Sequence, residues 1–311
     1  MGVAAKWRSA AASHPGRLRE ENQDRSYVDD ERGLFLVVDG LGGHAAGEKA
    51  AEVAVDVIRT ELASQDGDIR QSIRAAIATA NNRIAGLAAA HEAWHGMACV
   101  LTLAVIHEDK VVVGHVGDSR LYLIWNGSIR KLTSDHSPVG EREDRGELTE
   151  QEAMQHPRRN EVFRDVGSRP RNAEDDEFVE MKEFLFKPDA ALLLCSDGLS
   201  DLVTSAEMRE VIERYDGDAE AVSRDLVDAA NRAGGADNIT AIFVAGSDFL
   251  GSASPAMAEA RTRHSITRMR SGAVIDAPAN ILTAVARVLT TRAAFLVYGF
   301  VIGIVLALAW R

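Results

Sequence analysis

Short apolar runs bounded by turn residues, together with longer stretches of helical periodicity, make up the first 248 residues of the chain. The apolar runs predict strands, and they occupy residues 34–39, 99–106, 110–118, 120–125, part of 184–197, and 238–245. A period near 3.6 predicts helices over 46–64, 68–90, 205–215 and 219–233. Because strands and helices do not alternate strictly, the order favours two antiparallel sheets with helix pairs packed outside over a doubly wound parallel sheet. The predicted fold class is therefore α+β.

The pattern changes after residue 248. Residues 249–292 are rich in Ser, Ala, Arg and Pro without sustained periodicity, which is typical of a linker, here a basic one. Residues 293–310, "AAFLVYGFVIGIVLALAW", carry no charge and would measure about 27 Å as a helix, close to the hydrocarbon thickness of a bilayer. A buried core helix is the alternative, but the run is apolar all round. We expect a folded domain over 1–248, a linker, and one transmembrane helix over 293–310.

Charge is divided unevenly between these parts. The net charge is -12, but residues 249–311 hold seven arginines against Glu259 and Asp276, so the first 248 residues carry about -17. A body this acidic argues against nucleic acid as the main partner, whereas it suits divalent cations. The arginines of the linker precede the apolar run, so the positive-inside rule places the folded domain in the cytoplasm, attached through a single-pass tail anchor.

Four aspartates stand at the ends of predicted strands: Asp39, Asp118, Asp197 and Asp237. One such aspartate is common in turns and helix caps. Strand ends of a sandwich can lie together, however, and a cluster of carboxylates repels itself unless a cation neutralises it. Oxygen ligands select Mg²⁺ or Mn²⁺, and no Cys/His set has the spacing of a zinc site. Glycine after Asp39 and Asp197 would let the backbone approach such an ion.

Two other kinds of phosphate chemistry are excluded by spacing. Gly42 and Gly47 have the glycine spacing of a phosphate-binding loop, but Glu48 replaces the required lysine. A cysteine-dependent phosphatase needs an arginine six residues after its cysteine. The residues six positions after Cys99 and Cys195 are Val105 and Asp201, so both cysteines are expected to be reduced, buried thiols.

Seven segments, in this order, resemble the motifs of the metal-dependent serine/threonine protein phosphatases, the type 2C or PPM family, in its bacterial form. They are "RLREENQD" (17–24), "FLVVDGLGGHAAGE" (35–48), "VGDSRLYL" (116–123), "LTSDHS" (132–137), "GELTEQEAMQHPRRN" (146–160), "LLLCSDGL" (192–199) and "GGADNIT" (234–240). The resemblance covers residues 6–247. It implies a four-layer αββα fold, an antiparallel β-sandwich flanked by helix pairs, with 1–248 as the phosphatase catalytic domain.

The resemblance also implies a metal centre of two Mn²⁺ or Mg²⁺ ions, with a third, weaker site. Asp39 would bridge the first two ions, and the carbonyl of Gly40 would help to hold the first. Asp197 and Asp237 would hold the second, and Asp24 would act mostly through coordinated water. The third site would take Asp118 and share Asp197.

Arg19 occupies the position of the family's phosphate-binding arginine, and Asn238 is expected to support the site without binding metal. A water shared by two divalent cations loses its proton near neutral pH and attacks phosphorus in line, while Arg19 and the ions neutralise the phosphoryl oxygens. Gln23 replaces a frequent glutamate. Leu41 stands where eukaryotic relatives carry a histidine, so His44 is either the general acid or a structural residue at the entry to the next helix.

The polar segment 138–172, called the flap below, resembles the mobile segment that helps the family to select substrates. Within the flap, Ser168 is a candidate for the third metal, whereas His136, just before it, and His156 are expected to be structural. A solvated surface insertion is the alternative interpretation.

The resemblance predicts an enzyme that hydrolyses phosphoserine and phosphothreonine in proteins, opposing a Ser/Thr kinase at the membrane. Two alternatives stay open. One is a pseudophosphatase that uses the fold as a membrane-anchored binding module, and the other is an enzyme for a small phosphoester or a phosphorylated anti-sigma-factor antagonist.

Overall fold

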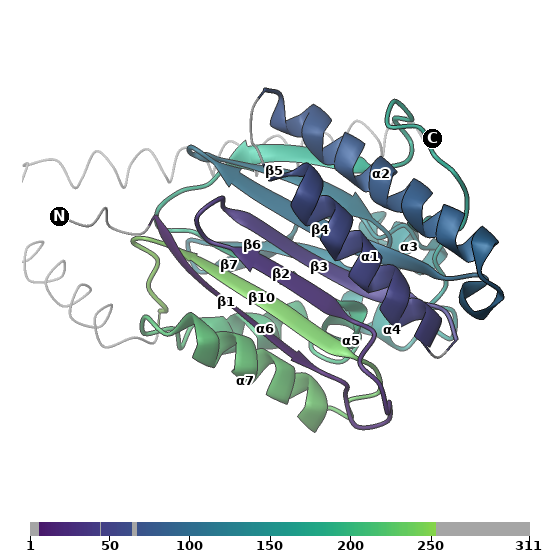
Figure 1. Ribbon diagram of the computed structural model, residues 1–311. Helices are drawn as coiled ribbons and strands as arrows, with labels where there is room; N and C mark the ends of the chain where they lie inside the picture. Colours follow the sequence, from purple (N-terminus) through teal and green to yellow (C-terminus); the bar gives the residue numbers. More distant parts are fainter. Residues whose placement is uncertain (1–5, 44, 64–66, 253–311) are drawn as a thin grey trace, which may run out of the picture. The chain divides into compact units, whose positions relative to one another are not determined.

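The computed structural model describes residues 6–43, 45–63 and 67–252. Two five-stranded sheets form its centre, and every paired strand in them is antiparallel to its neighbour (Figure 1). In the first sheet the strand order is β1 (Trp7–His14), β10 (Ile239–Gly246), β9 (Ala191–Cys195), β6 (Arg120–Trp125) and β7 (Ser128–Lys131). In the second sheet it is β2 (Arg25–Asp29), β3 (Leu34–Leu41), β4 (Ala98–His107), β5 (Lys110–Val116) and β8 (Glu180–Leu185).

A helix pair covers the outer face of each sheet (Figure 1). The second sheet is covered by α1 (Ala45–Glu61) and α2 (Ile69–Ala90), which is followed by a 3-10 turn at Glu92–Trp94. The first sheet is covered by α6 (Ser205–Ile212) and α7 (Ala219–Arg232). Shorter helices lie in the connections, namely α3 (Pro138–Asp144), α4 (Glu150–Met154) and α5 (Asp197–Ser200).

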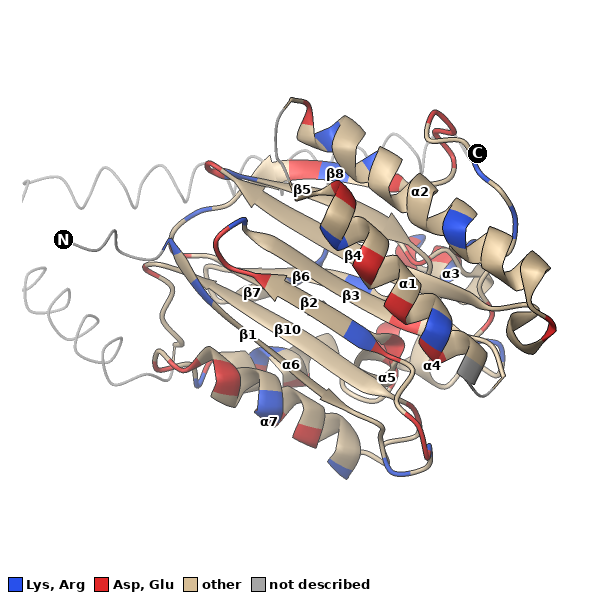
Figure 2. Cartoon of the chain, in the orientation of Figure 1, with Lys and Arg blue, Asp and Glu red and all other residues tan. Residues whose placement is uncertain are grey.

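The core has three apolar layers because the central strands are buried on both faces. Along β3, Leu34 and Leu36 pack under the helices, whereas Phe35 and Val37 point into the space between the sheets. The same alternation of side-chain direction, with a period of two residues, follows β10. Figure 2 shows the result: the central strands are almost free of charge, whereas α1 and α7 carry charges of both signs.

The α+β class with two antiparallel sheets and flanking helices is confirmed. Residues 293–310, where we predict a membrane-spanning helix, and nearly all of the predicted linker over 249–292 lie outside the described residues. In the part of the chain that the structure describes, no helix is long and apolar enough to cross a bilayer.

Candidate active site

The four predicted strand-end aspartates line one cavity of about 190 Å³. Asp39 lies near the end of β3 and Asp118 just beyond β5, so both come from the second sheet. Asp197 begins α5 directly after β9, and Asp237 precedes β10, so these two come from the first sheet. The structure therefore brings together carboxylates that are up to 198 residues apart. The rest of the lining is made by Arg19, Gln23, Gly40, Leu41, Gly42, Asn160, Val162 and Asn238.

Asp24 lies behind this lining rather than in it. Its side chain is buried, and the hydroxyl of Ser196 donates to its Oδ2 at 2.7 Å. Burial raises the pKa of Asp24 from 3.8 to about 6, although the hydrogen bonds from Thr240 and Ser196 favour the ionised form. Asp24 is also, after burial itself, the largest contributor to the raised pKa of Asp39, so the two carboxyl groups act on each other.

Electrostatic strain is concentrated at this site. The pKa values of Asp39 and Asp197 lie well above the usual range, first because the surrounding protein removes water from them and then because of the neighbouring carboxylates. The pKa of Asp118 is raised to about 7, with burial as the largest cause and Asp135 the next. Such a set of carboxyl groups is unfavourable when all of them are ionised, unless positive charge is added.

Close packing explains the glycine after Asp39. A Cβ atom on Gly40 would lie 2.3 Å from the carbonyl oxygen of Gly47 and 2.9 Å from that of Gln23. Glycine is therefore needed here so that the end of β3 can pack against the start of α1 and the loop before β2. We expected the glycine to allow close approach of an ion, whereas the structure gives the approach of other backbone segments as its reason.

The loop that carries Arg19 is tied to the start of β10. Nη2 of Arg19 lies 2.9 Å from Oδ2 of Asp237, at the exposed rim of the cavity. Asn238 accepts a hydrogen bond from the backbone N–H of Gln23 and donates to the carbonyl oxygens of Pro15 and Glu21. These three bonds agree with the supporting role predicted for Asn238.

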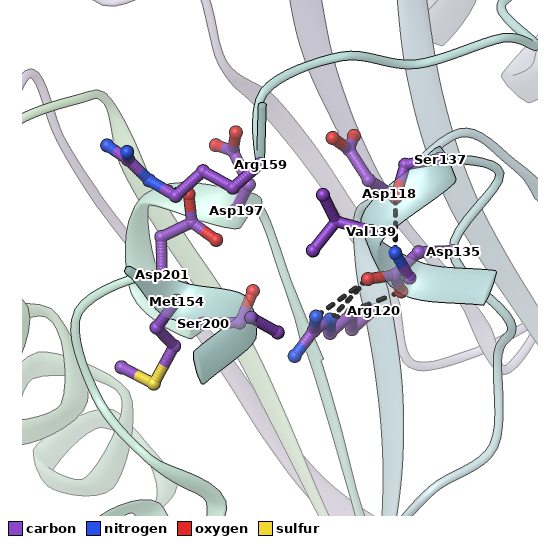
Figure 3. A pocket seen from close by; sticks show the side chains of 12 residues that line it. Asp118, Arg120, Asp135, Ser137, Val139, Met154, Arg159, Asp197, Ser200 and Asp201 are labelled. Carbon is purple, nitrogen blue, oxygen red and sulfur yellow. Dashed lines mark hydrogen bonds and ion pairs between the residues drawn. The ribbon is translucent and has the colours of Figure 1, made fainter. Parts of the chain in front are cut away.

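A smaller cavity of about 20 Å³ adjoins the first and also includes Asp118 (Figure 3). On one side, Arg120 and Asp135 form a buried ion pair with 2.6 Å between Nη2 and Oδ2. On the other, Nε of Arg159 donates to Oδ2 of Asp201 at 2.9 Å. The first pair stiffens the wall behind Asp118, and the second joins the flap to the end of α5.

The flap contributes two residues to the site that the sequence did not single out. Asn160 and Val162 line the larger cavity, so this segment forms one wall of the site. Ser168, which we predicted to approach the third metal, is exposed and is not among the described residues that line either cavity. His44, the candidate general acid, lies outside the described residues.

The donor set fits hard divalent cations. It consists of carboxylate oxygens with a backbone carbonyl and a side-chain amide nearby, and the cavity has no cysteine or described histidine in its lining. Oδ1 of Asp197 has no hydrogen-bond partner among the described residues, although almost no solvent reaches it. An uncompensated oxygen of this kind, beside carboxyl groups with raised pKa values, is what a bound Mg²⁺ or Mn²⁺ would satisfy.

Known proteins resemble the chain over the same region. A family profile described as Protein phosphatase 2C matches residues 17–229. The serine/threonine phosphatase stp of Listeria welshimeri is 36% identical over 238 residues, which cover 74% of this chain and 92% of that protein. The protein phosphatase PhpP of Streptococcus pneumoniae is 33% identical over 236 residues, which cover 74% and 93%.

Solved structures agree in fold. The crystal structure of the Mycobacterium tuberculosis serine/threonine phosphatase PstP/Ppp matches with a TM-score of 0.69 and 29% identity, covering 77% of this chain and 98% of that chain. The catalytic domain of PstP in complex with two manganese ions matches with a TM-score of 0.68 and 28% identity, covering 77% and 97%. The predicted cofactor, Mn²⁺ or Mg²⁺, agrees with the ions in that relative. This chain belongs to the protein phosphatase 2C family of serine/threonine phosphatases.

Proposed function

We propose that this chain hydrolyses phosphoserine and phosphothreonine in proteins, at the cavity lined by its strand-end aspartates. The observation that carries the proposal is the convergence of Asp39, Asp118, Asp197 and Asp237 from two different sheets, with Arg19 at the rim. In this proposal Asp39, the Gly40 carbonyl, Asp197 and Asp237 would hold two Mn²⁺ or Mg²⁺ ions. Asp24 supports them from behind, and Asp118 serves a third site.

The bound ions supply an activated water and positive charge for the phosphoryl oxygens. The chain supplies the rest of the chemistry. The Arg19 guanidinium, 55% exposed at the rim, binds an equatorial oxygen of the phosphoryl group and orients it for in-line attack. The carboxylates keep their places because they extend from the ends of strands buried in the core, so little reorganisation is needed during the reaction.

The sequence alone supports two further parts of the proposal, namely attachment to a membrane and action against a Ser/Thr kinase. Residues 293–310 would anchor the chain in a membrane, with the linker arginines keeping the catalytic domain in the cytoplasm. Tethering would raise the effective concentration of membrane-bound phosphoproteins near the site, including the products of a Ser/Thr kinase that the enzyme would oppose.

The full-length chain should release phosphate from a phosphothreonine peptide only when Mn²⁺ or Mg²⁺ is present, and Asp39→Asn should abolish the release. Exposed Asp225 on α7 provides the matched control, because Asp225→Asn removes a carboxylate from the far helix and should leave the rate unchanged. Hydrolysis that persists in EDTA would contradict the mechanism. Tight Mn²⁺ binding without hydrolysis would favour a binding module instead.

A further inference from the structure

His136 joins the end of β5 to the flap. Its ring is buried, with 6% of the residue exposed. Its backbone N–H donates to the carbonyl oxygen of Gly117 at 2.7 Å, and the N–H of Gly117 donates to its Nδ1 at 3.0 Å. His136 thus holds both backbone polar groups of the residue that immediately precedes Asp118.

The backbone at Gly117 has little freedom to adjust. Its φ is +108°, and a Cβ atom there would lie 2.1 Å from Cγ1 of Val100 on β4. Since Gly117 is buried, its N–H has no access to solvent if His136 stops accepting from it. Loss of that acceptor therefore leaves an unpaired amide next to Asp118.

The other side of His136 faces the flap. Its carbonyl oxygen accepts a hydrogen bond from the N–H of Phe163 at 3.0 Å. Its Nε2 lies 3.0 Å from Nη1 of Arg164. One histidine therefore touches both the segment that positions Asp118 and the flap that walls the cavity.

The two ring contacts compete with each other. The pKa of His136 is lowered to about 2, first by burial and then by His115 and Arg164, so the ring is neutral. A neutral imidazole has one N–H and one lone pair, and both the amide of Gly117 and a guanidinium can only donate. With the lone pair on Nδ1, the hydrogen bond from Gly117 forms. The proton is then on Nε2, where it faces the guanidinium N–H of Arg164, so no hydrogen bond forms between them. With the lone pair on Nε2, the Arg164 bond forms and the Gly117 amide is released.

A metal site is the other interpretation of this cluster, since His115, His136 and Glu180 each place a ligand atom within 4.8 Å of the others. Existing bonds argue against it. Glu180 already accepts from the N–H of Ser134 and pairs with Lys182. A cation on Nε2 of His136 would force a proton onto Nδ1, directly against the Gly117 N–H.

We propose that His136 is a positioning residue that couples the flap to Asp118 through a single lone pair shared in turn by Gly117 and Arg164. Approach of Arg164 draws the lone pair to Nε2 and frees the Gly117 amide, whereas withdrawal of Arg164 restores the bond that fixes the segment before Asp118. The consequence for metal binding at Asp118 rests on the proposed function.

Three variants and a control separate the two contacts. His136→Ala removes both ring nitrogens. His136→Asn keeps an acceptor at the position of Nδ1 but has no group at Nε2. Arg164→Met removes the competing donor, and Arg158→Met is the control, because Arg158 is an exposed flap arginine that pairs with Glu161.

The primary measurement is hydrogen–deuterium exchange of the Gly117 amide in the full-length protein, followed in a proteolytic fragment, with Mn²⁺ binding measured by titration calorimetry. We expect His136→Ala to speed exchange by about tenfold or more and to weaken the weakest Mn²⁺ site, whereas His136→Asn stays within about twofold of the wild type. Arg164→Met should slow exchange in the wild-type background and change nothing in the His136→Asn background. Arg158→Met should change nothing in either.

Equal exchange in His136→Ala and His136→Asn would overturn the proposal, as would an Arg164→Met effect of the same size in both backgrounds. If His136→Ala fails to fold, the effect of Arg164→Met in the wild type is compared with its effect in His136→Asn, and this comparison tests the proposal. This test is independent of the proposed function. Exchange of the Gly117 amide can be compared among the variants even if the wild-type protein shows no phosphatase activity.

Discussion

Removal of divalent cations should make the protein lose stability as the pH rises from about 4 to about 6. The cause is Asp24, whose pKa in the folded state is raised from 3.8 to about 6. Below the lower value the carboxyl group is protonated in both folded and unfolded chains, so it costs nothing. Between the two values the unfolded chain releases the proton while the folded chain keeps it, and the free energy of unfolding falls.

The size of the effect follows from the pKa difference. A shift of about two units corresponds to about 3 kcal/mol, which is lost across this window and stays lost above it. Asp39, Asp118 and Asp197, whose pKa values are also raised, act in the same direction. Since these groups interact, their contributions do not add independently.

Urea unfolding of the full-length protein in EDTA, at several pH values across the window, measures this loss. Asp24→Asn cannot ionise, so it should remove about 3 kcal/mol of the pH dependence and be more stable than the wild type near neutral pH. Asp225→Asn should keep the wild-type slope. Saturating Mn²⁺ should flatten the wild-type curve, because a ligand of the folded state stabilises it. A wild-type free energy that is constant or rises with pH in EDTA would refute the reasoning.

Other predictions concern the rim, the buried ion pair and the C-terminal segment. Arg19→Ala should raise KM for a phosphothreonine peptide by about tenfold or more, since one charge-assisted hydrogen bond is lost; steady-state kinetics with an unchanged KM would contradict its role. Arg120→Met should destabilise the protein by about 3–5 kcal/mol, because buried Asp135 keeps only Lys131, at 3.8 Å, as a charged partner. The double variant with Asp135→Leu should recover much of this loss in urea unfolding. Deletion of residues 293–311 should move the protein from the membrane to the soluble fraction with peptide hydrolysis unchanged, and a full-length protein that is soluble without detergent would contradict the anchor.

The central strands could be predicted because they are buried on both faces. β3, β4 and β10 lie inside their sheets, so almost every residue in them is apolar, and their predicted ends agree with the structure to within two residues. The missed strands, β1, β2 and β7, are all at sheet edges, as is β8, of which only the last two residues fall in a predicted run. Edge strands are covered on fewer sides, and their half-buried side chains give no continuous apolar run.

The site was only partly predictable from the residues themselves. Aspartates at strand ends are visible in the pattern, but their convergence depends on the register of two sheets packed face to face. Asn160 lies in a polar segment without periodicity, so nothing local distinguishes it from Ser168, and only the fold shows which of the two lines the cavity. The burial of Asp24 is not visible in the pattern for a similar reason, because its hydrogen-bond partner Ser196 lies 172 residues away in the sequence.

The most direct test of the account is the location of bound Mn²⁺ in crystals of the full-length protein or of its folded part, read from anomalous scattering. The account predicts two peaks in the larger cavity, within reach of Asp39, Asp197 and Asp237, and the loss of both peaks in Asp39→Asn. Absence of Mn²⁺ from this cavity at saturating concentration, in a protein that still hydrolyses the phosphopeptide, would contradict the claim that these carboxylates form the catalytic metal centre.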